Sequence, residues 1–121
     1  MATVLDVKHP GTHKVVLDHD IDVPMRDGAR LKANVFRPEA PCKYPVVMTF
    51  GPYGKDLHFS QHRLESWETL VNDYPEIFEA SSGKWMVFET PDPELWVPHG
   101  YVTVRVDSRV LINSGHRKSP Q

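Results

Sequence analysis

Two runs of alternating apolar and polar residues flank an Asp-Gly pair, and this arrangement restricts the opening of the chain to an antiparallel hairpin. The first run, residues 15–23, ends at residues 20–23 in the strict alternation of a half-buried strand. The second run, residues 30–37, alternates in the same way. Between them stands Asp27-Gly28, a strong hairpin signal because glycine accepts the positive φ that tight hairpin turns require. We therefore expect the two runs to pair antiparallel.

Two more apolar runs predict strands of a different kind. Residues 46–50, Val-Val-Met-Thr-Phe, follow a loop with three prolines, and their nearly unbroken apolar character is typical of a strand covered on both faces. Residues 101–107 carry β-branched side chains at every second position. We expect 46–50 at the centre of an α/β sheet and 101–107 parallel to it.

Helical signals lie between these two runs. Residues 63–72 place four apolar side chains on one helical face: Leu64, Trp67, Leu70 and Val71. Pro75 ends the pattern. Asp92-Pro93 reads as an N-cap with proline at the first helical position, opening a short helix that must end before Pro98. Residues 85–88 fit either a short strand or an aromatic loop packed on the sheet. The order predicts an α/β fold: a hairpin, then parallel strands with helices, in a sheet that lacks some of its neighbours.

Composition excludes several classes of function. The chain has 121 residues and 40% apolar residues, which suits one small domain, and a net charge of -2 with scattered lysines and arginines argues against a nucleic-acid partner. No apolar run approaches the roughly 20 residues that span a bilayer, and the first residues lack an apolar signal core, so we expect a soluble, cytoplasmic protein with no membrane partner. Cys42 is the only cysteine, which excludes an internal disulfide and a cysteine-based metal site.

Three stretches then occur in a recognisable order. They are MRDGARL with VFRP at 25–38, PVVMT with PYGK at 45–55, and PDPE, GYV and VDSR within 91–109. Each is weak alone, but together they resemble the amino-terminal part of serine hydrolases of the X-prolyl dipeptidyl-peptidase and cocaine-esterase-like (CocE/NonD) family. The resemblance implies an incomplete α/β-hydrolase sheet, hydrolysis of a small acyl ester or peptide by the full-length form, and no cofactor or metal. It leaves open whether an ester or a peptide bond is preferred.

The resemblance also implies a role for one tyrosine. The family's PYGK tyrosine points its hydroxyl at the developing oxyanion, and Tyr53 occupies that position here. A phenolic O–H held in a dry site stabilises charge that appears only in the transition state. The alternative is that Tyr53 only packs the turn, with its hydroxyl in water. The family's Asp-x-Arg holds loops together, so Asp107 and Arg109 are expected to be structural.

The nucleophile expected after Asp-x-Arg is missing. The family continues into G-x-G-x-S-x-G, but Val110 stands where glycine is expected and no glycine precedes Ser114 by two residues. We expect 1–109 to be a partial hydrolase domain, 110–121 a disordered tail, and the chain a truncated, inactive form, for example through an intron read as coding sequence. The alternative is a non-catalytic binding module or regulatory short isoform that captures a partner strand on an open sheet edge. Its oligomeric state is not predicted.

Histidines and tryptophans add little to this interpretation. His58 and His62 have a spacing that could chelate a metal on a helix, but without a third ligand nearby they are expected to be surface loop residues. His19 and His116 have no nucleophile to serve. The tryptophans at 67, 85 and 96 are expected to cover the core or the sheet.

Overall fold

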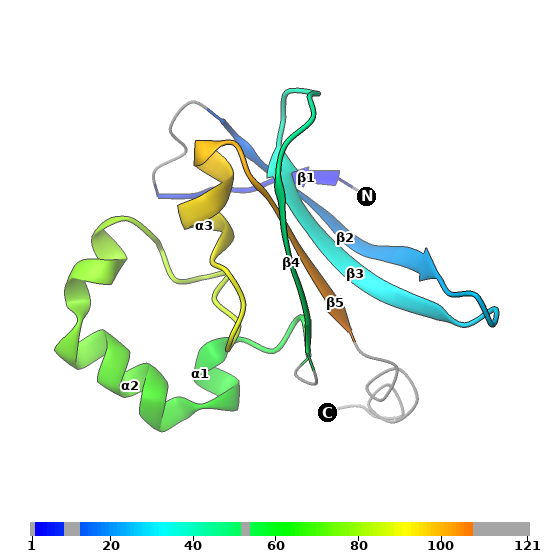
Figure 1. Ribbon diagram of the computed structural model, residues 1–121. Coiled ribbons are helices and arrows are strands. Elements are labelled where there is room, and N and C mark those ends of the chain that lie inside the picture. The colour runs from blue at the N-terminus through cyan, green and yellow to red at the C-terminus, as the bar shows by residue number, and fades with distance from the viewer. Residues whose placement is uncertain (1, 9–12, 52–53, 108–121) are drawn as a thin grey trace.

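The computed structural model describes residues 2–8, 13–51 and 54–107, and they form one five-stranded mixed sheet with helices on one side (Figure 1). The spatial order of the strands is β1-β2-β3-β5-β4. Their bounds are β1 Ala2–Val4, β2 Val15–Pro24, β3 Arg30–Pro38, β4 Val46–Gly51 and β5 Val102–Asp107. The helices are α1 Phe59–His62, α2 Leu64–Asp73 and α3 Pro93–Trp96, with 3-10 turns η1 Pro75–Glu79 and η2 Val97–His99.

The predicted hairpin is confirmed. β2 and β3 pair antiparallel from Val15 opposite Pro38 to Pro24 opposite Arg30. The turn between them includes Gly28 at φ 90°, in the left-handed region that favours glycine. The pairing has one irregularity, between Asp18 and Ile21, where the chain bulges. This bulge redirects the side chains of residues 19 and 20.

β5 lies between the hairpin and β4, antiparallel to β3 and parallel to β4. The parallel relationship of 46–50 and 101–107 is therefore confirmed. β4 is the last strand of the described sheet, so the described residues supply only one of the two neighbours expected for 46–50, in line with the prediction of a sheet that lacks some of its strands. Val46, Met48 and Phe50 share one face of β4 and are 58%, 63% and 58% exposed. The apolar composition of β4 indicates that its faces are suited to being covered, but it does not determine where the strand lies in the sheet. No other described strand pairs with the free edge of β4.

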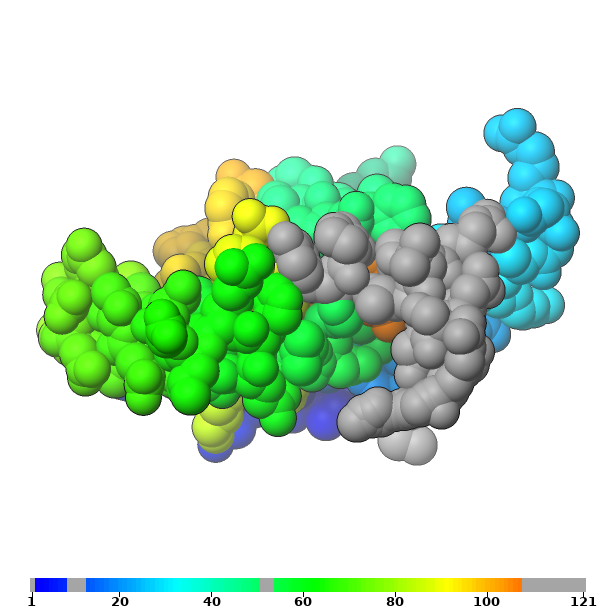
Figure 2. Space-filling view, turned by 90° about the horizontal axis from the view of Figure 1, so that it is seen from below, coloured from blue at the N-terminus to red at the C-terminus, as the bar shows by residue number. Residues whose placement is uncertain are grey.

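Both predicted helices are present, within a residue of their expected bounds. α2 projects away from the sheet, and Figure 2 shows this green segment at one end of the molecule and the β2–β3 turn at the other. Its apolar face is consequently only partly covered: Leu64 is 57% and Val71 is 38% exposed. α3 begins as predicted, because the Asp92 side chain accepts a 3.0 Å hydrogen bond from the Glu94 N–H.

The core lies between the sheet and the segment around α3. Its buried cluster consists of Val15, Leu17, Phe36 and Val97. Trp85 packs against it, with its ring centroid 6.0 Å from that of Phe36. Residues 85–88 thus form the aromatic loop, the second of the two alternatives, with a single β-bridge between Val87 and His58. None of the helices in the described ranges is long and apolar enough to cross a membrane.

Candidate functional site

The carboxyl ends of β4 and β5 lie side by side, with Gly51 opposite Asp107. The chain leaves β4 into the turn that carries the PYGK motif, and Tyr53 itself lies outside the described residues. The far end of that turn is fixed, because the backbone N–H of Lys55 donates a 2.7 Å hydrogen bond to Oδ1 of Asp107. This bond is the loop-holding contact expected of Asp107. Arg109 also lies outside the described residues.

Lys55 is the centre of a charged network beside this turn. Its side chain is buried, and Nζ donates hydrogen bonds to Asp20 Oδ1 at 2.5 Å and to Asp56 Oδ2 at 2.7 Å. Burial by itself would lower the pKa of Lys55, but the hydrogen bonds with Asp20 and Asp56 outweigh it and leave the pKa raised. Lys55 is therefore a firmly charged group that ties the turn after β4 to the bulge of β2.

The same network orders Asp56 and His19. Asp56 Oδ1 accepts a 2.9 Å hydrogen bond from Asn34 Nδ2 and lies 3.0 Å from His19 Nε2. Burial pushes the pKa of Asp56 up, but the hydrogen bonds from Lys55, Asn34 and His19 prevail, so the pKa is lowered. His19 Nδ1 lies 3.1 Å from Asp20, so the bulged residues close a ring of polar contacts.

Possible metal ligands come together at one place in the described ranges, at His19, Asp20 and Asp56. Their ligand atoms lie within 4.8 Å of one another, but the ammonium of Lys55 already sits between the two carboxylates. The arrangement is a completed ion-pair network, and Lys55 supplies the cation.

The predicted pair His58 and His62 lies on α1, with His58 as the N-cap. His58 is half-buried, unlike the surface loop residue expected, and its Nδ1 and Nε2 lie 2.9 Å from Ser60 Oγ and 2.7 Å from the Gly83 carbonyl oxygen. Its ring packs edge-on against Trp67 with centroids 5.0 Å apart. His58 thus fastens the loop around residue 83 to α1, because capping and packing use both its nitrogens and its ring.

Arg105 is the second buried cation of the site. It projects from β5 and donates from Nη2 to the carbonyl oxygens of Trp85 at 2.5 Å and Pro91 at 3.3 Å, and the guanidinium carbon lies 4.9 Å from the centre of the Phe36 ring. Burial lowers the pKa of Arg105 to about 10, against the attraction of Asp92 and the more distant Asp56. The guanidinium therefore remains charged at neutral pH.

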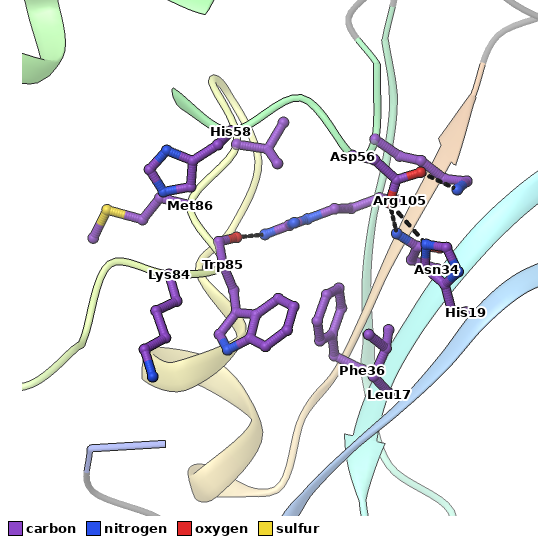
Figure 3. A pocket seen from close by; sticks show the side chains of 12 residues that line it. Leu17, His19, Asn34, Phe36, Asp56, His58, Lys84, Trp85, Met86 and Arg105 are labelled. Carbon is purple, nitrogen blue, oxygen red and sulfur yellow. Dashed lines mark hydrogen bonds and ion pairs between the residues drawn. The ribbon is translucent and has the colours of Figure 1, made fainter. Parts of the chain in front are cut away.

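A cavity of about 150 Å³ lies between these groups (Figure 3). Residues from the hairpin, the turn after β4, the aromatic loop and β5 form its wall: Leu17, His19, Asn34, Phe36, Lys55, Asp56, His58, Lys84, Trp85, Met86, Val87 and Arg105. It combines apolar walls with a few placed polar groups, which is the composition of small-molecule sites.

Sequence reasoning did not single out Lys55, Asp56 or Arg105. A signal existed for Arg105, because it is a charged residue within a run that otherwise reads as a buried strand. The sequence alone does not pair His19 with Asp56; the bulge of β2 brings the two side chains together. Ser114 and His116 lie outside the described residues.

Comparisons with known proteins agree with this fold. A family profile described as X-Pro dipeptidyl-peptidase (S15 family) matches residues 27–116. The cocaine esterase of Rhodococcus sp. (strain MB1 Bresler) is 33% identical over 66 residues, covering 53% of this chain and 12% of the esterase.

Solved structures give the same result. Two crystal structures of a CocE/NonD family hydrolase from Staphylococcus aureus align with 38% and 35% identity, each with a TM-score of 0.57 over 77% of this chain and 15% of that protein. The chain belongs to the X-Pro dipeptidyl-peptidase (S15) family, and its sheet corresponds to the amino-terminal part of a CocE/NonD α/β-hydrolase fold. Both the predicted family and the predicted fold class are confirmed.

Proposed function

We propose that these residues form the amino-terminal part of a serine hydrolase that cleaves acyl esters or peptide bonds through an acyl-enzyme, with Tyr53 as an oxyanion donor. The observation that carries the proposal is the hydrogen bond from Lys55 N–H to Asp107. It fixes the turn that follows β4 at the carboxyl ends of two parallel strands, where α/β folds place their active sites. One preorganised oxyanion donor contributes roughly 3 kcal/mol of transition-state stabilisation.

We further propose that residues 1–121 alone do not hydrolyse substrate. They contain no G-x-S-x-G motif, and an oxyanion donor without an attacking group produces no acyl-enzyme. The chain spans 12% to 15% of the relatives described above, so the activity of the whole hydrolase is a proposal for a longer polypeptide. Sequencing the mature transcript across the codon for Arg109 tests the intron explanation, which a continuous reading frame into Val110 would exclude.

Incubation with 4-nitrophenyl esters and with a fluorophosphonate tests inactivity. We expect no turnover above background and no covalent adduct by intact-protein mass spectrometry. The matched control is Ser114→Ala, because Ser114 is the serine in the tail that is followed by glycine. A fluorophosphonate adduct on the 121-residue chain that disappears in Ser114→Ala would refute the proposal.

A second candidate is a binding module, and the free edge of β4 favours it. Residues 46–51 contain no charged side chain and no proline, the usual features that protect an edge strand from pairing with another chain. An extended partner segment could add a strand beside β4. This candidate predicts a cooperative thermal transition for the isolated chain. The first predicts a less stable chain that binds a hydrophobic dye, because Val46, Met48 and Phe50 have no cover among the described residues.

A further inference from the structure

Arg105 is a buried cation that no carboxylate of the described residues contacts directly. Only 3% of the residue is exposed, and its Nε is buried without a hydrogen-bond partner. Both of its hydrogen bonds end on backbone carbonyl oxygens, and no carboxylate of the described residues lies within ion-pair distance. Buried charges in proteins are normally paired, because removing an ion from water is costly.

Lys55 shows the contrast within the same cavity. It is buried to the same extent as Arg105, yet it contacts the two carboxylates of Asp20 and Asp56. Asp56 is already satisfied by Lys55 and by Asn34. Asp92 and Asp56 attract Arg105 without contacting it, so the guanidinium has no direct counter-ion among the described residues. It lies in the wall of a cavity. Figure 3 shows Arg105 reaching from β5 across to the Trp85 carbonyl.

The size and walls of the cavity define what could supply the missing anion. Its volume is about 150 Å³, and an apolar cavity of about that size is large enough for benzene. Phe36, Trp85, Met86 and Val87 offer apolar surface for a hydrocarbon group. A guanidinium fits a carboxylate in two-point geometry, and one positive charge without a direct counter-ion matches a monoanion better than a dianion.

We propose that this cavity binds a small monocarboxylate, no larger than about benzoate, with the carboxylate paired to Arg105 and the hydrocarbon group against Phe36 and Trp85. Lys55, the last residue of the PYGK motif, lies in the cavity wall, but the proposal involves neither Tyr53 nor hydrolysis. Binding supplies a carboxylate in direct contact with Arg105, so a ligand of this class stabilises the folded chain by mass action.

The experiment measures saturable binding of sodium benzoate to the 121-residue chain by equilibrium dialysis, and its effect on the thermal midpoint at constant ionic strength. Benzamide serves as the neutral analogue, acetate as the carboxylate without a large apolar group, and inorganic phosphate as the unrelated anion. We expect saturable benzoate binding and a rising thermal midpoint, weaker acetate binding, and no effect of benzamide or phosphate.

The decisive variant is Arg105→Met, which keeps a stem of similar length over Phe36 and removes the charge. Arg105→Met leaves the Trp85 and Pro91 carbonyl oxygens without its hydrogen bonds, so circular dichroism first checks that the variant folds. The comparison of benzoate with benzamide tests the need for a charge without any substitution. We expect at least about a tenfold loss of benzoate affinity, or 1.4 kcal/mol. Arg26→Met makes the same change at an exposed position in the β2–β3 turn and should bind benzoate like the unaltered chain.

Several results would overturn the proposal. They are the absence of saturable benzoate binding in dialysis, equal binding of benzoate and benzamide, phosphate binding as tight as that of benzoate, and unchanged benzoate affinity in Arg105→Met. Dialysis needs no thermal transition, so the proposal stays testable if the chain melts without cooperativity. A failure here leaves the proposed hydrolase function untouched, because no catalytic group takes part.

Discussion

The carboxylate of Asp107, the last residue of β5, accepts a 2.7 Å hydrogen bond from the backbone N–H of Lys55, the residue that ends the PYGK turn. Two parallel strands are thereby joined at their carboxyl ends as well as along their length. Burial raises the pKa of Asp107, against the hydrogen bond from Lys55. The contact therefore holds the turn, but part of the free energy that the hydrogen bond contributes is offset by the desolvation of the buried carboxylate.

Replacing Asp107 with alanine should release the turn with only a modest loss of global stability. We expect a decrease in the free energy of unfolding of about 1 kcal/mol, because the lost hydrogen bond is partly balanced by the relieved desolvation of the carboxylate. Urea denaturation measures this loss, and hydrogen exchange at the Lys55 amide should accelerate. Asp107→Asn keeps an oxygen acceptor and should lose less. Unchanged exchange at Lys55 in Asp107→Ala would contradict the contact.

Removing the Lys55 charge should cost more. Lys55→Met leaves Asp20 and Asp56 close together without the cation between them. We expect a loss of about 2 kcal/mol in the free energy of unfolding, between the values for exposed and fully buried ion pairs, because the lysine is buried while both carboxylates are about half exposed. Lys43→Met, at an exposed position, is the matched control and should change stability by less than about 0.5 kcal/mol. Equal effects of the two variants would show that the network contributes nothing.

The network also predicts an acid-sensitive share of stability. The pKa of Asp56 is lowered from 3.8, because hydrogen bonds from Lys55, Asn34 and His19 outweigh the effect of burial. A carboxylate with a lowered folded-state pKa contributes stability above its unfolded pKa and loses it as the pH falls through the folded value. The difference in unfolding free energy between the unaltered chain and Asp56→Asn should therefore be fully developed near pH 5 and shrink below pH 3.8. Urea denaturation across this range measures it, and a difference that grows towards acid pH would refute the assignment.

The local elements of this fold could be predicted from the sequence, because they depend on neighbouring residues. The alternation around Asp27-Gly28 predicts the β2–β3 hairpin, and Asp92-Pro93 predicts the start of α3. The position of 46–50 in the sheet could not be predicted in the same way. The apolar composition of a strand indicates that its faces can be buried. The order of the strands in the sheet depends on contacts between segments far apart in the chain.

The candidate site was predictable only in part for the same reason. The PYGK motif indicated the turn after β4, and Asp107 was expected to hold loops together. The bulge of β2 carries no clear sequence signal, yet it brings His19 and Asp20 to Asp56 and Lys55. Such polar networks form through tertiary contacts, so the spacing of their members along the chain does not reveal them.

A glycine pair separates backbone strain from steric crowding in the loop that covers the core. Gly83 and Gly28 both have positive φ, 78° and 90°. A Cβ on Gly83 would lie 2.7 Å from the Phe78 ring, whereas a Cβ on Gly28 would meet nothing within 4 Å. We expect Gly28→Ala to lower the free energy of unfolding by about 1 kcal/mol, from the left-handed backbone alone. Gly83→Ala should lower it by about 2–3 kcal/mol, because crowding against the aromatic ring adds to the same backbone cost. Urea denaturation measures both, and near-UV circular dichroism should report displaced aromatic rings in Gly83→Ala only. Equal losses for the two variants would mean that the loop around Gly83 moves away from the Phe78 ring at no cost, and that this contact is not tightly packed.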